Sequence, residues 1–203
     1  GRCVISDIDD TIKISNVQDR QALLANTFLR KFQPVDGMAS RYRKWADAGA
    51  AFHYVSASPW QLYQPLTDFC RSEGFPAGSF QMKRFRLQDS SGWTFFGSQE
   101  GYKAGVIERI LADFPQRRFT LVGDSGENDP EVYAAIARKH PGQVEHIFIR
   151  NVGGRPQQLT KDDPRFVDYY GRPWAQAWEK YFEQGWEKPD SSAAPADVLD
   201  LFK

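Results

Sequence analysis

The chain has 203 residues, of which 41% are hydrophobic and 14% are aromatic, so it is long enough to bury one sizeable core. Its 26 lysines and arginines balance its 26 aspartates and glutamates, which leaves a net charge of zero. This balance argues against the strongly basic surface typical of nucleic-acid-binding proteins, and no apolar run approaches the roughly 18 residues of a transmembrane segment.

Apolar runs alternate with helical patterns along the chain, which predicts an α/β fold whose parallel sheet is covered on both faces. Strands are expected at residues 2–6, 50–55, 79–83, 119–122 and 144–149. Helices are expected at residues 21–32, 38–48, 60–73, 102–114, 130–139 and 174–182. Gly49 and Gly74 are expected to end two of these helices, while Ser58 and Pro59 should begin the helix at 60–73.

The pattern also predicts how the chain is divided. Residues 1–150 should form the core, in which 13–49 contribute a small helical insertion and the helix that leads to the second strand. Residues 151–203 should form a helical extension that packs on this core and is loosely ordered near 189–195. Because the chain starts abruptly at its first strand, we expect an upstream region before it.

The cysteines bear on the compartment. Cys3 and Cys70 are too few for a disulfide-rich fold, so we expect two buried thiols. We therefore expect a cytoplasmic protein, with peripheral association with a membrane as an alternative.

Two carboxylates, Asp7 and Asp9, directly follow the first expected strand. Residues two apart in an extended chain point to the same side, and like charges held close repel unless a cation or a proton lies between them. A divalent metal, with one carboxylate as nucleophile and the other as acid and base, would suit phosphoryl transfer through an aspartyl-phosphate. Asp10 is expected to be a solvated charge or a turn residue, and Thr11 to steady the loop.

A second acidic cluster, Asp124 and Asp129, follows the strand at 119–122 beside flexible glycines. Alone it would indicate an acidic turn in which Asp129 caps the next helix. Because the carboxyl ends of parallel strands share one edge of a sheet, two such clusters favour a site for Mg²⁺ before Ca²⁺. Ser56 ends another strand at this edge, where its hydroxyl either donates to a phosphate oxygen or caps the following helix.

A cation is also needed to neutralise the aspartate and phosphate charges. Lys103 opens an expected helix, a position that is unfavourable toward the helix dipole and therefore suggests a functional reason. Lys83 is its rival. Lys83 belongs to a basic run with Arg84 and Arg86, which is better suited to contact a substrate head group.

These motifs resemble those of the haloacid dehalogenase superfamily of aspartate-nucleophile phosphatases. The segment Asp7-Ile8-Asp9-Asp10-Thr11 matches the DxDxT motif, and the other three motifs are matched by Ser56, by Lys103, and by Gly123-Asp124 with Asp129. Within this superfamily the chain resembles the catalytic domain of actin-patch-type phosphatidate phosphatases. The segments that carry this second resemblance are 6–13 (SDIDDTIK), 34–38 (PVDGM), 54–63 (YVSASPWQLY) and 74–76 (GFP).

The resemblance implies a Rossmann-like three-layer α/β/α sandwich and Mg²⁺-dependent hydrolysis of phosphatidate, a lipid at a membrane surface, to diacylglycerol and phosphate. Asp7 would be the nucleophile, and Mg²⁺ would bind Asp7, the Asp9 backbone carbonyl and Asp124. Asp9 would be the acid and base if burial raises its pKa. Ser56 and Lys103 would hold the phosphoryl oxygens. Asp129 would bind the metal directly or through water.

Two other functions stay open. A phosphatase for a soluble phosphomonoester or a phosphoprotein would use the same chemistry, and Arg84 and Arg86 do not separate these substrates. A non-catalytic phosphatidate-binding module is disfavoured because both Asp7 and Asp9 are retained. Trp60 is one of six tryptophans, which are favoured at membrane interfaces, but a place in the core is the stronger expectation for such residues.

Overall fold

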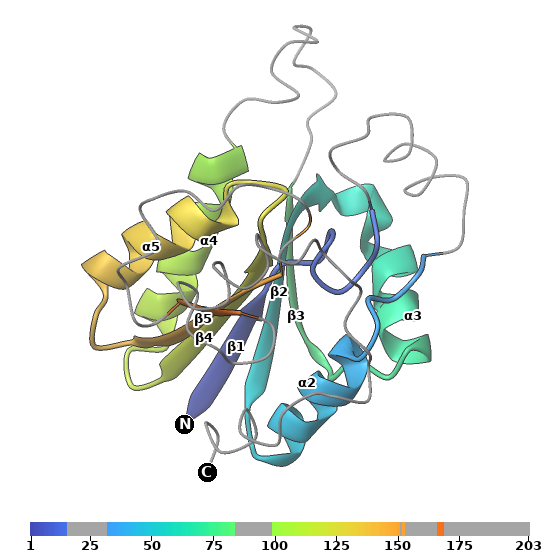
Figure 1. Ribbon diagram of the computed structural model, residues 1–203, viewed down its shortest axis with the longest axis horizontal. Helices are drawn as coiled ribbons and strands as arrows, with labels where there is room; N and C mark the ends of the chain where they lie inside the picture. Colours follow the sequence, from blue (N-terminus) through green and yellow to red (C-terminus); the bar gives the residue numbers. More distant parts are fainter. Residues whose placement is uncertain (16–31, 84–98, 151, 153–165, 169–203) are drawn as a thin grey trace, which may run out of the picture.

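The computed structural model describes residues 1–15, 32–83, 99–150, 152 and 166–168 (Figure 1). These residues contain a six-stranded sheet in the order β3-β2-β1-β4-β5-β6, in which every neighbouring pair is parallel. The strands are β1 (Arg2–Ser6), β2 (Ala51–Pro59), β3 (Gly78–Lys83), β4 (Arg118–Asp124), β5 (Val144–Arg150) and β6 (Phe166–Asp168). The expected α/β class with a parallel sheet is therefore confirmed.

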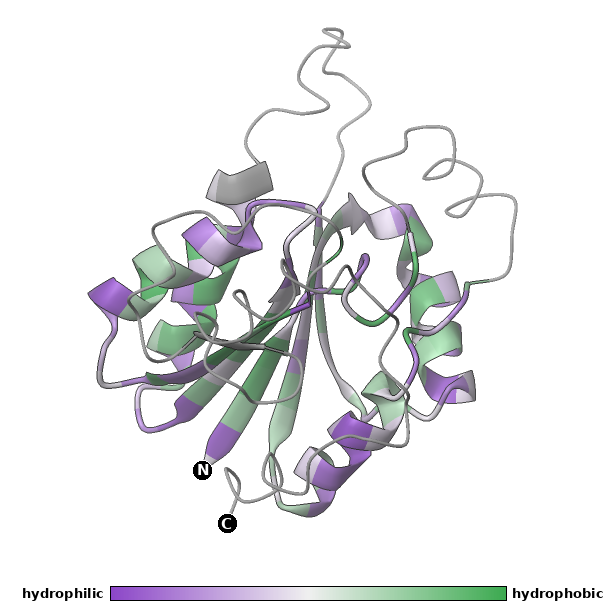
Figure 2. Ribbon diagram, viewed as in Figure 1, coloured by the Kyte–Doolittle hydropathy of each residue, from purple (hydrophilic) through white to green (hydrophobic). Residues whose placement is uncertain are grey.

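The central strands β1 and β4 are apolar on both faces. Val4 and Val122 pack into one core cluster. Ile5 and Leu121, which are paired with each other in the sheet, pack into the other cluster. Figure 2 shows these strands largely in green, between helices that carry both purple and green residues. Near-continuous apolar runs are what a parallel sheet requires when helices cover both of its faces.

Helices lie on both faces of the sheet (Figure 1). The described helices are α2 (Met38–Asp47), the short 3-10 helix η1 (Trp60–Leu62), α3 (Tyr63–Ser72), α4 (Gln99–Asp113) and α5 (Asp129–Lys139). Helix α2 buries Tyr42 and Trp45 in the cluster that also contains Leu66 of α3. Ile107 of α4 and Ile136 of α5 lie in the second cluster. The molecule is thus the three-layer α/β/α sandwich that the sequence predicts.

The order of the strands places a particular edge at the centre of the fold. From β1 the chain moves outward to β2 and β3, returns through α4 to β4 on the other side of β1, and continues outward to β5. The loops that follow β1 and β4 therefore diverge to opposite faces. The carboxyl ends of β1 and β4 form a topological switch point, where open α/β sheets bind their ligands.

Two expectations about the elements were wrong. The sheet has a sixth strand, β6, which pairs with β5 inside the segment expected to be helical; a strand of three residues carries too short a pattern to recognise. Ser58 is not the helix cap and Pro59 is not the first helical residue, because β2 continues through Pro59, which is itself the N-cap of η1, and the pairing of β2 with β3 shifts register there. Gly49 and Gly74 do end helices, at φ values of 91° and 74°.

Other predictions fall outside the described residues, namely the helices at 21–32 and 174–182 and the loose stretch at 189–195. The division at residue 150 stays a prediction. Within the segment 13–49, residues near 13 and near 34 lie side by side. Lys13 and Pro34 form an antiparallel bridge, and the Val35 N–H donates to the Ile12 carbonyl at 2.9 Å. The insertion therefore leaves and re-enters the fold right beside Asp9.

Two further observations concern the cysteines and the helices. Cys3 and Cys70 are both buried and neither forms a disulfide, as expected. Among the helices that the structure describes, none combines the length and the apolar character needed to cross a bilayer.

Candidate active site

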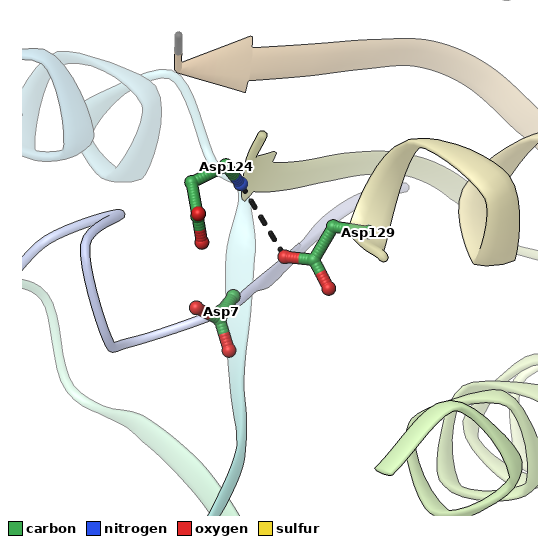
Figure 3. Close-up of side chains that lie close together, drawn as sticks. All are labelled: Asp7, Asp124 and Asp129. Carbon is green, nitrogen blue, oxygen red and sulfur yellow. Dashed lines mark hydrogen bonds between the residues drawn. The ribbon is translucent and has the colours of Figure 1, made fainter. Parts of the chain in front are cut away.

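Three carboxylates converge at the switch point of the sheet. Asp7 follows β1, Asp124 ends β4, and Asp129 begins α5 (Figure 3). Each offers an oxygen that lies within 4.8 Å of the oxygens of the other two, and all three side chains are buried. The sequence predicted that both acidic clusters would meet at this edge, and the structure brings Asp7 of the first cluster together with Asp124 and Asp129 of the second, without the Asp9 side chain.

Asp7 is held in place by an extension of the sheet. Its N–H donates to the Val122 carbonyl at 2.8 Å, which continues the pairing of β1 with β4 beyond Ser6. The Thr11 hydroxyl lies 3.4 Å from Asp7 Oδ2 and 3.5 Å from Asp124 Oδ2. Thr11 thus steadies the two carboxylates as well as the loop.

Asp124 and Asp129 are linked through the backbone. The Asp124 N–H donates to Asp129 Oδ2 at 3.3 Å (Figure 3), and the Gly126 N–H donates to Asp124 Oδ1 at 2.6 Å. Asp129 does not cap α5, whose N-cap is Asn128. Gly123 allows this arrangement by having no side chain, since a Cβ there would lie against Asp129 and 2.7 Å from the Tyr133 ring. Close approach, rather than the expected flexibility, explains this glycine.

Lys103 is the cation of the cluster. Its Nζ lies 2.9 Å from Asp7 Oδ1, 2.7 Å from Asp129 Oδ1 and 2.8 Å from Glu127 Oε2. The preference for Lys103 over Lys83 agrees with this position beside Asp7. Lys103 does not open its helix, however, because α4 begins at Gln99 and Lys103 lies in its second turn. The dipole argument was therefore the wrong reason for choosing it.

The charges in this cluster do not balance. Burial raises the pKa of Asp7 above its usual range, against the attraction of Lys103, and burial together with Asp129 raises the pKa of Asp124 to about 8. Burial opposes the charge on Lys103, but the surrounding carboxylates outweigh it and hold the pKa of Lys103 well above its usual value. Three acidic side chains around one ammonium form an oxygen-rich site in which ionisation of every carboxyl group is unfavourable, and a hard divalent cation such as Mg²⁺ would relieve that cost.

Asp9 lies in a separate, fully partnered network. Lys13 Nζ forms an ion pair with Asp9 Oδ1 at 2.8 Å, and the Ser15 hydroxyl donates to the same oxygen at 2.6 Å. The Ser56 and Ser58 hydroxyls donate to Asp9 Oδ2 at 3.1 and 2.9 Å. Ser58 therefore serves Asp9, and it does not cap a helix.

This network sets the ionisation of Asp9. Burial would raise the pKa of Asp9, but the Lys13 ammonium and the hydrogen bonds from Lys13, Ser15 and Ser58 lower it to about 2. The expectation that burial raises this pKa was wrong, because the sequence alone did not show that Lys13 would be buried beside Asp9. In the free protein Asp9 is a carboxylate.

Asp10 is a turn residue, as one of the two expectations had it, but it is not solvated. It adopts a left-handed φ of 52°, which aspartate tolerates better than most residues, and its side chain is buried. The Ser15 N–H donates to Asp10 Oδ1 at 2.7 Å, and Arg150 at the end of β5 donates to its carbonyl. These bonds fold the chain back after Asp9.

Sequence reasoning missed several residues of the site, which are Lys13, Ser15, Ser58, Glu127 and Arg150. Lys13 carried a usable signal, because a lysine between two isoleucines, four residues after Asp9, interrupts an apolar segment. Lys83 lies at the end of β3, two strands away from β1. Arg84 and Arg86 lie outside the described residues.

The chain is similar to known proteins over most of its length. The family model described as phosphatidate phosphatase APP1, catalytic domain, matches residues 2–151. The chain is 39% identical to the phosphatidate phosphatase APP1 of Saccharomyces cerevisiae over 172 residues. This aligned region covers 83% of this chain and 29% of the yeast protein. The chain is 30% identical over 174 residues to an uncharacterized protein of Schizosaccharomyces pombe, which covers 80% and 28%. The chain thus spans less than a third of these curated relatives.

Proposed function

Because the chain belongs to the family of the phosphatidate phosphatase APP1 catalytic domain, a family of phosphoric monoester hydrolases, we propose that it hydrolyses phosphatidate to diacylglycerol and phosphate. The observation that supports this most directly is the position of Asp7. It lies at the switch point of the sheet, 2.9 Å from the Lys103 ammonium and close to Asp124 and Asp129. A carboxylate with this surrounding suits attack on a phosphate ester.

Mg²⁺ is the proposed cofactor. Asp7, Asp124 and the Asp9 backbone carbonyl would hold it, with Asp129 as a direct or water-mediated ligand. When bound, the cation would offset the negative charge of the carboxylates and of the phosphate, and so stabilise the charge that develops during transfer.

The transfer step is assigned to Asp7. One carboxylate oxygen of Asp7 attacks phosphorus in line with the diacylglycerol oxygen, the P–O bond to that oxygen breaks, and an aspartyl-phosphate forms. Lys103 and Ser56 hold the phosphoryl oxygens in this proposal. Both are buried within the same edge of the sheet, and Lys103 already contacts the nucleophile.

The proton transfers are assigned to Asp9. Its ionised carboxylate can accept a proton from the water that hydrolyses the aspartyl-phosphate. The departing alkoxide, which leaves in the earlier step, needs a proton. Asp9 can supply it only if substrate binding weakens the contacts of Asp9 with Lys13 and the serine hydroxyls, so that the carboxylate first takes up a proton from solvent. The two tasks thus place different demands on one carboxyl group.

The test is phosphate release in the presence of Mg²⁺, measured from phosphatidate in mixed micelles and from soluble phosphomonoesters. Asp7→Asn keeps the shape of the side chain and removes the nucleophile, so release should stop. Asp47→Asn is the matched control, because Asp47 is an exposed residue at the end of α2. Release that persists in Asp7→Asn would contradict the mechanism.

The same experiment separates the substrates. Activity on soluble esters alone would keep the mechanism and exclude phosphatidate. Binding of phosphatidate without turnover of any ester would indicate a binding module instead of an enzyme.

A further inference from the structure

Among the described residues, the large hydrophobic side chains that are exposed are Trp60 at 43%, Tyr63 at 36% and Phe114 at 41%. Two of them form a pair. The rings of Trp60 and Tyr63 stack with centroids 4.7 Å apart and planes 17° apart. The expectation that tryptophans such as Trp60 belong to the core was therefore wrong for this residue, and its exposure calls for an explanation.

The pair lies at the same edge of the sheet as the acidic site. Trp60 begins η1 directly after Pro59, the last residue of β2, and the same strand end carries Ser56 and Ser58, which bind Asp9. Phe114 follows α4 and precedes the first residue of β4, so it lies at the opposite edge.

The pair is supported by a row of aromatic rings. Tyr63 packs edge-on against Phe80 at 5.8 Å, and Phe80 stacks on the buried Tyr54 at 4.9 Å. The Tyr54 hydroxyl in turn donates to the Pro76 carbonyl at 2.8 Å. Rings held in this way have little conformational freedom to lose when they are covered, which favours their use as an anchor.

A basic residue lies beside the pair. Lys83, the last residue of β3, is in register with Pro59, next to Trp60. Indole and phenol rings are favoured where one side of the ring meets apolar chains and the other meets water, as at the surface of a bilayer. Lysine near such a surface is attracted to anionic lipids.

We propose that Trp60 and Tyr63 insert into the headgroup region of an anionic lipid bilayer, with Lys83 beside them, and turn the catalytic edge of the sheet toward the membrane. The choice of a bilayer as the occupant rests on the proposed function, because phosphatidate lies in such a bilayer. The aromatic pair then binds the surface and takes no part in the chemistry at Asp7.

The first assay is flotation with two kinds of vesicle, phosphatidylcholine alone and phosphatidylcholine with phosphatidylserine, which is anionic but not the proposed substrate. Trp60→Ala and Tyr63→Ala should each weaken binding to the anionic vesicles by about tenfold, because the exposed part of each ring would lose its contact with the bilayer. The double variant should bind more weakly than either single variant. Phe114→Ala, an equally exposed aromatic at the other edge, should bind like the wild type.

The second assay compares two forms of the substrate. The double variant should hydrolyse short-chain monomeric phosphatidate at the wild-type rate, which also shows that it is folded, and should lose activity on phosphatidate in vesicles. Equal loss on both forms would overturn the proposal, since the pair would then act within the site.

Two further outcomes separate failure of the proposed function from failure of the membrane contact. If the wild type hydrolyses no phosphatidate but its binding to phosphatidylserine vesicles depends on Trp60 and Tyr63, the proposed function fails and the membrane contact stands. If the double variant binds these vesicles as tightly as the wild type, the proposal is overturned, and a protein partner or another segment of this chain is the better candidate to cover the pair.

Discussion

Gly123 is the residue on which the position of Asp129 depends most directly. A Cβ added by Gly123→Ala would lie 2.8 Å from the Asp129 Cβ and 2.7 Å from a carbon of the Tyr133 ring. Neither neighbour is free to move, because Asp129 is ion-paired to Lys103 and the Tyr133 hydroxyl donates to the Val122 carbonyl at 3.2 Å. Overpacking of a rigid site costs about 1–3 kcal/mol of unfolding free energy.

For a chain of this length, that cost corresponds to a melting temperature roughly 3–10 °C lower, which differential scanning calorimetry measures. The displaced Asp129 should also weaken the rise in melting temperature that Mg²⁺ produces. Gly105→Ala is the matched control, because Gly105 lies on α4 with no atom within 4 Å of an added Cβ. Alanine is the better helix former, so this variant should melt about 1–3 °C higher.

A melting temperature of Gly123→Ala equal to that of the wild type would refute this reasoning. It would mean that β4 and α5 can separate without cost, and that the contact between Gly123 and Asp129 does not determine the site. A lower melting temperature with an unchanged response to Mg²⁺ would instead show that Asp129 is not a ligand.

The buried ion pair, the acidic cluster and the two thiols each lead to a further expectation. Lys13→Met leaves the buried Asp9 carboxylate without its cation, so the free energy of unfolding in urea should fall by about 3–5 kcal/mol; a fall below about 1 kcal/mol would mean that the hydroxyl groups suffice. Mg²⁺ should raise the melting temperature of the wild type but not of Asp124→Asn, with chelator as the control. Burial raises the pKa of Cys3, and that of Cys70 to about 12, so Ellman's reagent should react with these thiols only as fast as the protein unfolds.

Much of the fold could be predicted because its signals are local. Each long strand is an apolar run followed by polar residues, and Gly49 and Gly74 mark helix ends by the left-handed conformation that glycine adopts at no steric cost. The family match confirms the resemblance that was based on four short segments. Strand β6 was not predicted, because it is defined by its pairing with β5 and has no sequence pattern of its own.

The partners of the site residues were harder to predict than the residues themselves. Ser58 looked like a helix cap because serine before proline is common there, but the continuation of β2 brings its hydroxyl to Asp9. Glu127 looked like one more charge in an acidic loop, yet the packing of α4 on α5 brings Lys103 to it. Such pairs join segments that are distant along the chain, and no single segment encodes them.

The gathering of Asp7, Asp9, Asp124 and Asp129 at one edge of a parallel sheet could be predicted from the sequence alone, because the direction of the strands follows from the alternation of strand and helix. How these carboxylates are ionised depends instead on the packing of segments that are distant in the sequence. The pKa of a buried carboxylate depends on which cations and donors lie within a few ångströms of it. Packing gave Asp9 the buried Lys13, whereas Asp7, Glu127 and Asp129 share Lys103.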